Sequence, residues 1–331
     1  MFAREASENP QLKAYLEHVI LLKNDCEKGA GVDLAKTYQV RVYPTFAMVN
    51  HAGEVTDRWA GYPGVAGFVE IVDAALADPR TIAEKEQAFA AEPTLALGHS
   101  LGRYSEAVFA NQDAVRYYRK AMELDPDHAG DLSGKVFMAM YYGVRGGDFT
   151  PEEVVQEGKA ILMADSVDPG TALSVAGVTR HLAAPEEYKP LLKAALAATR
   201  NATGDMAEAR KDLEIDAALL LENDRPKAMM LKRGTLPEGW YDDPGELNSF
   251  AWWCYENNLN LDEALTLALR GAELASSDAD RANILDTAAE IAFKQGDTKQ
   301  AIELETRAVE LAPDRDGFKK TLQKFQGTLG S

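Results

Sequence analysis

The sequence predicts a mixed α/β domain in residues 1–78, followed by an all-α region of paired helices in residues 79–331. Two observations lead to this fold class. Two runs rich in β-branched and aromatic residues, 45–50 and 54–60, flank an Ala-Gly turn, which is the pattern of a β-hairpin. Beyond residue 78 the long segments carry apolar residues at helical spacing, and no alternating strand pattern returns.

The first domain is expected to begin with a short helix, because Asn9 is a good N-cap residue and Pro10 suits the first helical position. Four consecutive apolar residues within 19–25 then predict a strand that is buried on both faces. A helix is expected over 33–38 and a closing helix over 65–76. The apolar side chains that the closing helix should bury are Phe68, Ile71, Val72 and Leu76.

A proline, Pro44, stands at the start of the first hairpin strand. Proline has no amide hydrogen to give to a sheet, so it is expected at the first residue of a strand, with Tyr43 extended before it. The Tyr43–Pro44 bond is expected to be cis, since an X-Pro bond prefers the trans form by only about 0.5–1 kcal/mol.

This order of elements resembles the thioredoxin family, whose members carry a Val-x-x-Tyr-Pro-Thr element like the one at residues 40–45. The resemblance covers roughly residues 1–78 and implies a partial thioredoxin-like α/β sandwich. In that family the loop holds the backbone of a protein substrate. The resemblance therefore implies a substrate-binding loop at Tyr43, Pro44 and Thr45.

The family's Cys-x-x-Cys motif is absent, and the two cysteines, Cys26 and Cys254, are far apart in the sequence. In the family the first thiolate attacks a disulfide and the second resolves the mixed disulfide. The chain should therefore show no disulfide reductase activity, and no catalytic residue is assigned in it. It is expected to begin inside the domain, with strands 19–25 and 45–50 either separated by a gap or paired directly and antiparallel.

The second region contains a repeat in which two alanines lie seven residues apart and a proline follows the first alanine by twelve. The positions are Ala114, Ala121 and Pro126 in one segment, and Ala301, Ala308 and Pro313 in another. Small residues at this spacing suit the close crossing of two helices. The pattern resembles the tetratricopeptide repeat, which implies a solenoid of antiparallel helix pairs that contacts protein or peptide partners.

Two further helix starts are expected at Thr150 and Asp243, each followed by proline and then by a glutamate at the third helical position. Cys254 lies on the apolar stripe of the second of these helices and is expected in the core. Glutamates in the last repeat are expected on a solvated face rather than as paired acids. They include Glu303, Glu305 and Glu310.

Composition narrows the function further. The net charge of −18, from 35 basic and 53 acidic residues, disfavours binding to a phosphate backbone. No apolar run approaches the roughly 18–20 residues of a membrane span. No nucleotide-binding glycine motif and no metal-ligand spacing is present, so no cofactor is expected. The compartment stays open: export is favoured if a signal peptide precedes this sequence, and the cytoplasm otherwise.

Two functions from different classes remain, and the first is favoured for the intact protein. The first is a thiol-disulfide oxidoreductase, in which a longer protein supplies the dithiol and the helical repeats hold a client. The second is a non-catalytic scaffold, in which both regions only bind a partner. A Cys-x-x-Cys codon pair upstream of residue 1 would favour the first function, and its absence would favour the second.

Overall fold

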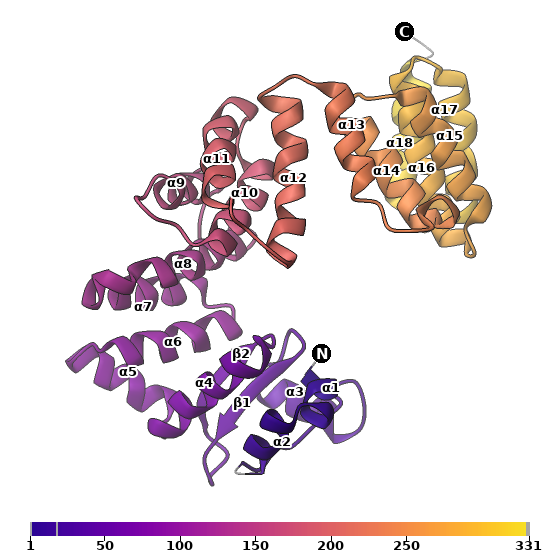
Figure 1. Ribbon diagram of the computed structural model, residues 1–331. Helices are drawn as coiled ribbons and strands as arrows, with labels where there is room; N and C mark the ends of the chain where they lie inside the picture. Colours follow the sequence, from indigo (N-terminus) through magenta and orange to yellow (C-terminus); the bar gives the residue numbers. More distant parts are fainter. Residues whose placement is uncertain (1, 18, 329–331) are drawn as a thin grey trace. The chain divides into compact units, whose positions relative to one another are not determined.

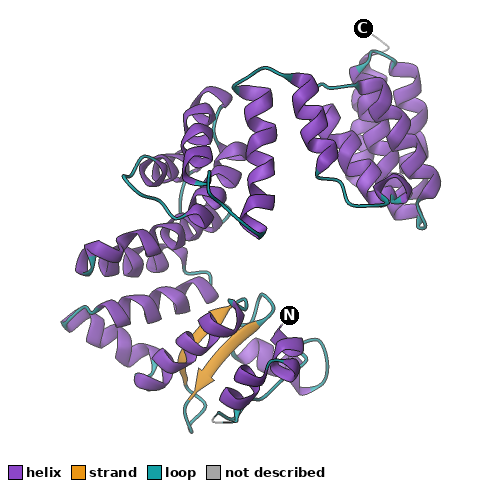
Figure 2. Ribbon diagram, viewed as in Figure 1, coloured by secondary structure: helices purple, strands orange, loops and turns teal. Residues whose placement is uncertain are grey.

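The computed structural model describes residues 2–17 and 19–328, which are mostly helical with one two-stranded sheet (Figures 1 and 2). The chain forms two compact units, Met1–Leu213 (unit 1) and Glu214–Ser331 (unit 2). The sheet lies in unit 1, and the division at residue 78 expected from the sequence stays a prediction. None of the helices in the described part of the chain has both the length and the apolar character needed to cross a membrane.

Unit 1 opens with short helices and a hairpin. Its first elements are α1 (Phe2–Glu8), α2 (Pro10–Leu16), α3 (Ala30–Thr37), β1 (Thr45–Val49), β2 (Val55–Ala60) and α4 (Gly64–Ala77). The helix start at Asn9 is confirmed, because the Asn9 side chain accepts a hydrogen bond from the backbone N–H of Leu12. The Tyr43–Pro44 peptide bond is cis, as expected.

The predicted hairpin is confirmed. Strands β1 and β2 pair antiparallel, with Phe46 opposite Trp59, and Gly53 in the turn holds a φ of 80° that glycine adopts without strain. The Trp59 ring stacks on Phe46 at 5.3 Å and meets Phe68 of α4 edge-on at 5.9 Å. These rings, with the buried Val72, form the core under the sheet.

The strand expected over 19–25 is wrong. Residues 20–25 form no helix or strand, and the side chains of Ile20 and Leu22 are 95% and 79% exposed. Strand β1 pairs only with β2 among the described residues, so this run has no ladder for its N–H and C=O groups. Neither the expected gap nor the expected direct pairing with 45–50 is present. A thioredoxin-like sandwich is therefore not confirmed.

The predicted closing helix is confirmed as α4, but the predicted burial of Leu76 is wrong. Phe68 and Val72 are buried, whereas Leu76 is 53% exposed and Ala75 takes the core position. Successive helical residues are rotated by about 100° around the helix axis. Ala75, three residues after Val72, therefore lies on the core face, whereas Leu76, four residues after it, does not.

The rest of unit 1 is helical. It contains α5 (Ile82–Ala91), α6 (Leu95–Ala107), α7 (Asn111–Leu124), the 3₁₀ turn η1 (Pro126–His128), α8 (Ala129–Val144), α9 (Pro151–Leu162), α10 (Pro169–Leu182) and α11 (Pro185–Ala198). Ala114 and Ala121 are fully buried, as predicted. A Cβ on Gly98 would lie 2.9 Å from that of Ala121, so α6 and α7 cross closely. The capping box predicted at Thr150 is present.

Unit 2 repeats the same arrangement. Helix α12 (Asp205–Leu220) spans the boundary between the units. It is followed by α13 (Arg225–Gly234), η2 (Trp240–Asp242), α14 (Pro244–Glu256), α15 (Leu261–Leu274), α16 (Asp278–Lys294), α17 (Thr298–Leu311) and α18 (Asp316–Thr328). Asp243 caps α14, Cys254 is buried in the core, and Ala301 and Ala308 are fully buried, all as predicted. These helix pairs give the chain a tetratricopeptide-like helical-repeat fold.

One glutamate prediction is wrong. Glu303 and Glu310 are exposed, as expected, but Glu305 is fully buried. Glu305 lies one helical turn after Ala301 and so shares the face of α17 that packs on α16. A residue on that face is buried whatever its charge.

Candidate functional site

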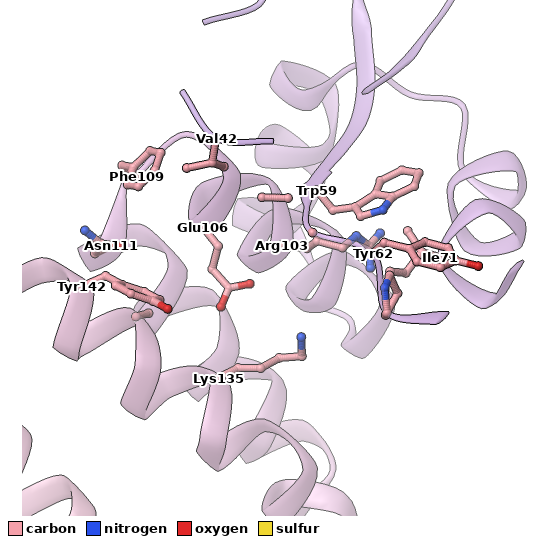
Figure 3. Close-up of a pocket in the computed structure, with 14 residues that line it drawn as sticks. Val42, Trp59, Tyr62, Ile71, Arg103, Glu106, Phe109, Asn111, Lys135 and Tyr142 are labelled. Carbon is pink, nitrogen blue, oxygen red and sulfur yellow. The ribbon is translucent and has the colours of Figure 1, made fainter. Parts of the chain in front are cut away.

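A cavity of about 610 Å³ lies in unit 1 between the end of the hairpin and helices α6 and α8 (Figure 3). Strand β2 contributes Trp59, helix α6 contributes Arg103 and Glu106, and helix α8 contributes Lys135 and Tyr142. In Figure 3 the Glu106 carboxylate and the Lys135 amine point toward the same space. The cavity is thus built from segments that are widely separated in the sequence.

Two further cavities adjoin the first. One of about 640 Å³ shares Phe109, Asn111 and Tyr142 with it. The other, of about 450 Å³, shares Glu106, Lys135 and Tyr142 and reaches α10. Because neighbouring cavities have walls in common, we treat the three as one continuous feature along α6, α8 and α10, called the groove below.

Phe109 sits in an unusual backbone position beside the groove. It follows α6 with a φ of 63°, in the left-handed region that glycine favours and bulky residues rarely adopt. Its ring is 39% exposed, lines two of the cavities, and lies 5.8 Å from the Arg41 guanidinium. Backbone strain of this kind is often kept at functional sites. Phe109 is therefore a strong candidate for contact with a partner.

A buried charge network fixes one wall of the groove. Asp57 of β2 accepts hydrogen bonds from Arg103 Nη2 at 2.6 Å and from Ser100 Oγ at 3.0 Å. Lys85 of α5 lies 3.8 Å from the same carboxylate and donates to the Thr56 carbonyl at 2.7 Å. The Asp57 and Lys85 side chains are fully buried. Burial lowers the pKa of Lys85, and Asp57 opposes that effect.

Glu106 occupies the middle of the groove. The Tyr118 hydroxyl donates a hydrogen bond of 2.7 Å to its Oε2. Burial raises the pKa of the Glu106 carboxyl, while Lys135 and the Tyr118 hydrogen bond act in the opposite direction. Burial also raises the pKa of Tyr118 well above its ordinary value, so this hydroxyl stays protonated and remains a donor.

The loop that the family resemblance singled out lies next to the groove. Tyr43 is 61% exposed, and the Thr45 hydroxyl donates to the carbonyl of Val42 at 2.7 Å. Val42 and Arg41, which precede the loop, line the groove. The binding role assigned to Tyr43, Pro44 and Thr45 stays a prediction.

The two cysteines lie in different units. Cys26 is half-buried in an irregular segment, and Cys254 is buried, with its pKa raised to about 12 by burial. Over residues 2–17 and 19–328, no group of three or more His, Cys, Asp or Glu side chains is placed to bind a metal ion.

Sequence reasoning missed most residues of the groove. Two features of the sequence could have indicated it. Tyr141 and Tyr142 are adjacent on a helix, so both cannot face the core, and they are 36% and 59% exposed. Asp57 and Arg58 interrupt the apolar pattern of the second hairpin strand, and both are buried. No feature of the sequence singled out Lys135 or Arg41 as residues of the groove.

No protein-family model and no curated protein matches the chain. Among solved structures, a chain of the APC/C hetero-tetramer Cut9–Hcn1 is 14% identical, with 73% of this chain and 45% of that chain covered and a TM-score of 0.40. The TPR protein YrrB, whose structure is described as having an unusual peptide-binding site, is 17% identical over 72% of this chain and 97% of that one, with a TM-score of 0.34.

A third similar structure is BtubC from P. vanneervenii, which is 14% identical over 63% of this chain and 90% of that one, with a TM-score of 0.39. The chain spans less than half the length of the matching chain in the APC/C hetero-tetramer. All three likenesses are distant. The class of protein follows from the helix pairs described above: this is a tetratricopeptide-like helical-repeat protein with a small hairpin-containing segment at its start.

Proposed function

We propose that the chain is a non-catalytic protein-binding scaffold and that the groove holds an extended segment of a partner protein. The observation that carries this proposal is the row of aromatic side chains left partly exposed beside the cavities, namely Phe109, Tyr141 and Tyr142. Aromatic side chains give large contact areas and dominate the energy of many protein interfaces.

The rigidity of the groove supports the same function. Tyr142 is held on α8, and Arg103 is held by the buried carboxylate of Asp57. Side chains that are already ordered lose little conformational entropy when a partner binds. Cavities of 450 to 640 Å³ also fall within the size range of sites that accept whole side chains.

Thiol-disulfide exchange is the weaker function for this chain. The reaction needs an accessible thiolate with a second thiol beside it. Burial raises the pKa of Cys254 to about 12, which disfavours its thiolate, and each unit contains a single cysteine, so neither unit holds a dithiol of its own. In an insulin-turbidity assay we expect no activity above the uncatalysed background, and clear activity would contradict the scaffold proposal.

A thioredoxin-like relation of residues 1–78 is proposed as architecture only. The chain order α2, α3, β1, β2, α4 supports it, and the absence of a strand at 19–25 counts against it. In this proposal the Tyr43–Thr45 loop forms the rim of the groove and makes backbone contacts with the partner.

The proposal can be tested with an unbiased library of displayed peptides selected on the full chain. Selected peptides should bind Tyr142→Ala and Phe109→Gly at least about tenfold more weakly than the wild type, a loss of about 1.4 kcal/mol each. The Phe109→Gly change suits the left-handed backbone, so it removes the ring without adding strain. Tyr241→Ala, at a tyrosine 47% exposed in unit 2, is the matched control.

If the library yields no binding peptide, or if the selected peptides bind the groove variants and the control equally well, the groove is not the binding site and the proposal fails.

A further inference from the structure

The groove gathers positive charge on a strongly acidic chain. Arg41, Lys135 and Arg145 are exposed and line its cavities, although the chain carries a net charge of −18. None of the three forms an ion pair within 4.0 Å in the part of the chain that the structure describes. Arg41 lies over the Phe109 ring at 5.8 Å, and Lys135 lies over the Tyr118 ring at 5.8 Å. These cations are therefore available to a partner.

The acidic groups of the groove are already hydrogen-bonded within the chain. Glu106 already accepts the Tyr118 hydroxyl, and burial raises its pKa toward the uncharged form. Asp148 accepts a hydrogen bond of 3.4 Å from the side-chain nitrogen of Asn111, and Asp168 accepts one of 2.8 Å from the backbone N–H of Thr171. Arg103, the remaining cation on the wall, is neutralised by Asp57. What remains is a groove with three cations that form no ion pair and three carboxyls that each already accept a hydrogen bond.

The hydrogen-bonding groups of the groove also indicate the chemistry of its partner. The indole N–H of Trp59, which lines the cavity, is buried and has no acceptor among the described residues. Ammonium, guanidinium and indole groups donate hydrogen bonds and accept none. A partner that pairs with the three exposed cations must therefore supply acceptors.

Resting on the scaffold function, we propose that the partner segment is acidic: an extended stretch of protein with carboxylates on both sides of one or two apolar side chains. The apolar side chains lie against Phe109 and Tyr142, and the carboxylates pair with Arg41, Lys135 and Arg145. Charge complementarity of this kind gives specificity and fast association. It also gives a role to three exposed cations that form no ion pair, on a chain whose net charge would otherwise repel an acidic partner.

The test uses the full chain and a fluorescein-labelled short peptide with glutamates on both sides of a Phe-Leu pair. The matched probe is the same peptide with glutamine in place of every glutamate. Fluorescence anisotropy should show the acidic peptide binding at least about tenfold more tightly, with an affinity that falls as salt is added. Arg145→Glu and Arg41→Glu should each weaken binding of the acidic peptide by about tenfold.

Arg200→Glu is the matched control, because Arg200 is exposed in the same unit, lies outside the groove and produces the same change in net charge. If Arg200→Glu weakens binding as much as Arg145→Glu, the effect is one of net charge and the proposal fails. Equal binding of the glutamine peptide, or equally tight binding of a single-stranded oligothymidylate, would also overturn it.

The outcome is separable from that of the scaffold function. A library that selects neutral or basic peptides at the groove would overturn the acidic partner and leave the scaffold in place. A library that selects nothing would remove both.

Discussion

Each unit of the molecule buries a carboxyl group, and the neighbours of these two carboxyl groups differ: cations in one unit and another acid in the other. Asp57 in unit 1 is surrounded by Arg103, Lys85 and Ser100, which all lie within 3.8 Å of its carboxylate. Glu305 in unit 2 is equally buried, but among the described residues no N–H or O–H donor reaches either of its oxygens. Its neighbour is another acid, Asp286.

The difference shows two ways to bury an acid in a helical repeat. Asp57 keeps cations close, so its charge is compensated where it lies. Glu305 instead keeps its proton and donates it to Asp286: burial, with the charge of Asp286, raises the pKa of Glu305 to about 8. The first arrangement ties the hairpin to α5 and α6, and the second makes the packing of α16 and α17 sensitive to pH.

The largest expected effect comes from breaking the first arrangement. Asp57→Asn leaves Lys85 and Arg103 close together without their counter-ion, and removing one member of a buried ion pair typically costs about 3–5 kcal/mol. Hydrogen exchange of peptides from β2 and α6 in increasing urea measures the loss. Asp113→Asn, which breaks the exposed pair with Arg116, should cost less than about 1 kcal/mol. Similar losses in the two variants would contradict the network.

The second arrangement predicts a pH dependence. Between its ordinary pKa of 4.5 and about 8, Glu305 holds a proton in the folded chain and loses it in the unfolded chain. The free energy of unfolding of unit 2 should therefore fall as pH rises through this range, by about 2–4 kcal/mol, and then level off. Hydrogen exchange of α16 and α17 peptides, compared near the ordinary pKa of 4.5 and near about pH 8, measures the change.

Glu305→Gln is the matched variant, because its amide donates to Asp286 without titrating. Glu290 and Lys324 also face the pair and are retained in the variant. The pH slope should disappear from α16 and α17. A slope that persists would assign the titration to another group.

A change of packing without charge should have a smaller effect at the same crossing. Ala308 is fully buried on α17, so Ala308→Leu adds volume where no space exists and should destabilise unit 2 by about 1–3 kcal/mol. Arg307→Leu, one residue earlier on the exposed face, is the control and should change stability by less than about 0.5 kcal/mol. The measurement is the urea midpoint of α17 exchange, and an unchanged midpoint for Ala308→Leu would contradict the repeat alignment.

The smallest effect is expected in unit 1 and has the opposite sign. Gly177 is exposed within α10, and a Cβ there meets no atom within 4 Å, so Gly177→Ala should stabilise unit 1 by about 0.4–1 kcal/mol. Gly102→Ala is the contrast, because its Cβ would lie 2.3 Å from the Tyr118 ring. If both variants raise the midpoint of α6 and α10 exchange, the close packing at Gly102 is wrong.

Local rules predicted the parts of the fold that depend on neighbouring residues. The hairpin turn at Gly53, the caps at Asn9, Thr150 and Asp243, and the buried alanine at 308 were all accessible in this way. The strand over 19–25 was not, because a strand exists only with a partner strand, and an apolar run carries no information about its partner.

The groove was not predictable for a related reason. It brings Arg41, Trp59, Phe109 and Lys135 together from separate elements, and no short motif links them. The burial of Glu305 could not be predicted from its residue type, because a glutamate in a helix is normally exposed to solvent. In both cases the missing information is how elements distant in the sequence pack on one another.

The buried amine of Lys85 has a practical consequence. Its side chain is fully covered by the hairpin and α6, so an amine-reactive reagent can reach it only when the hairpin moves away from the helices. Exposed amines, such as that of Lys120, will be acylated at once and give the reference rate. When labelling is faster than reclosing, the rate of covalent labelling at Lys85 therefore measures how often the hairpin separates from α5 and α6.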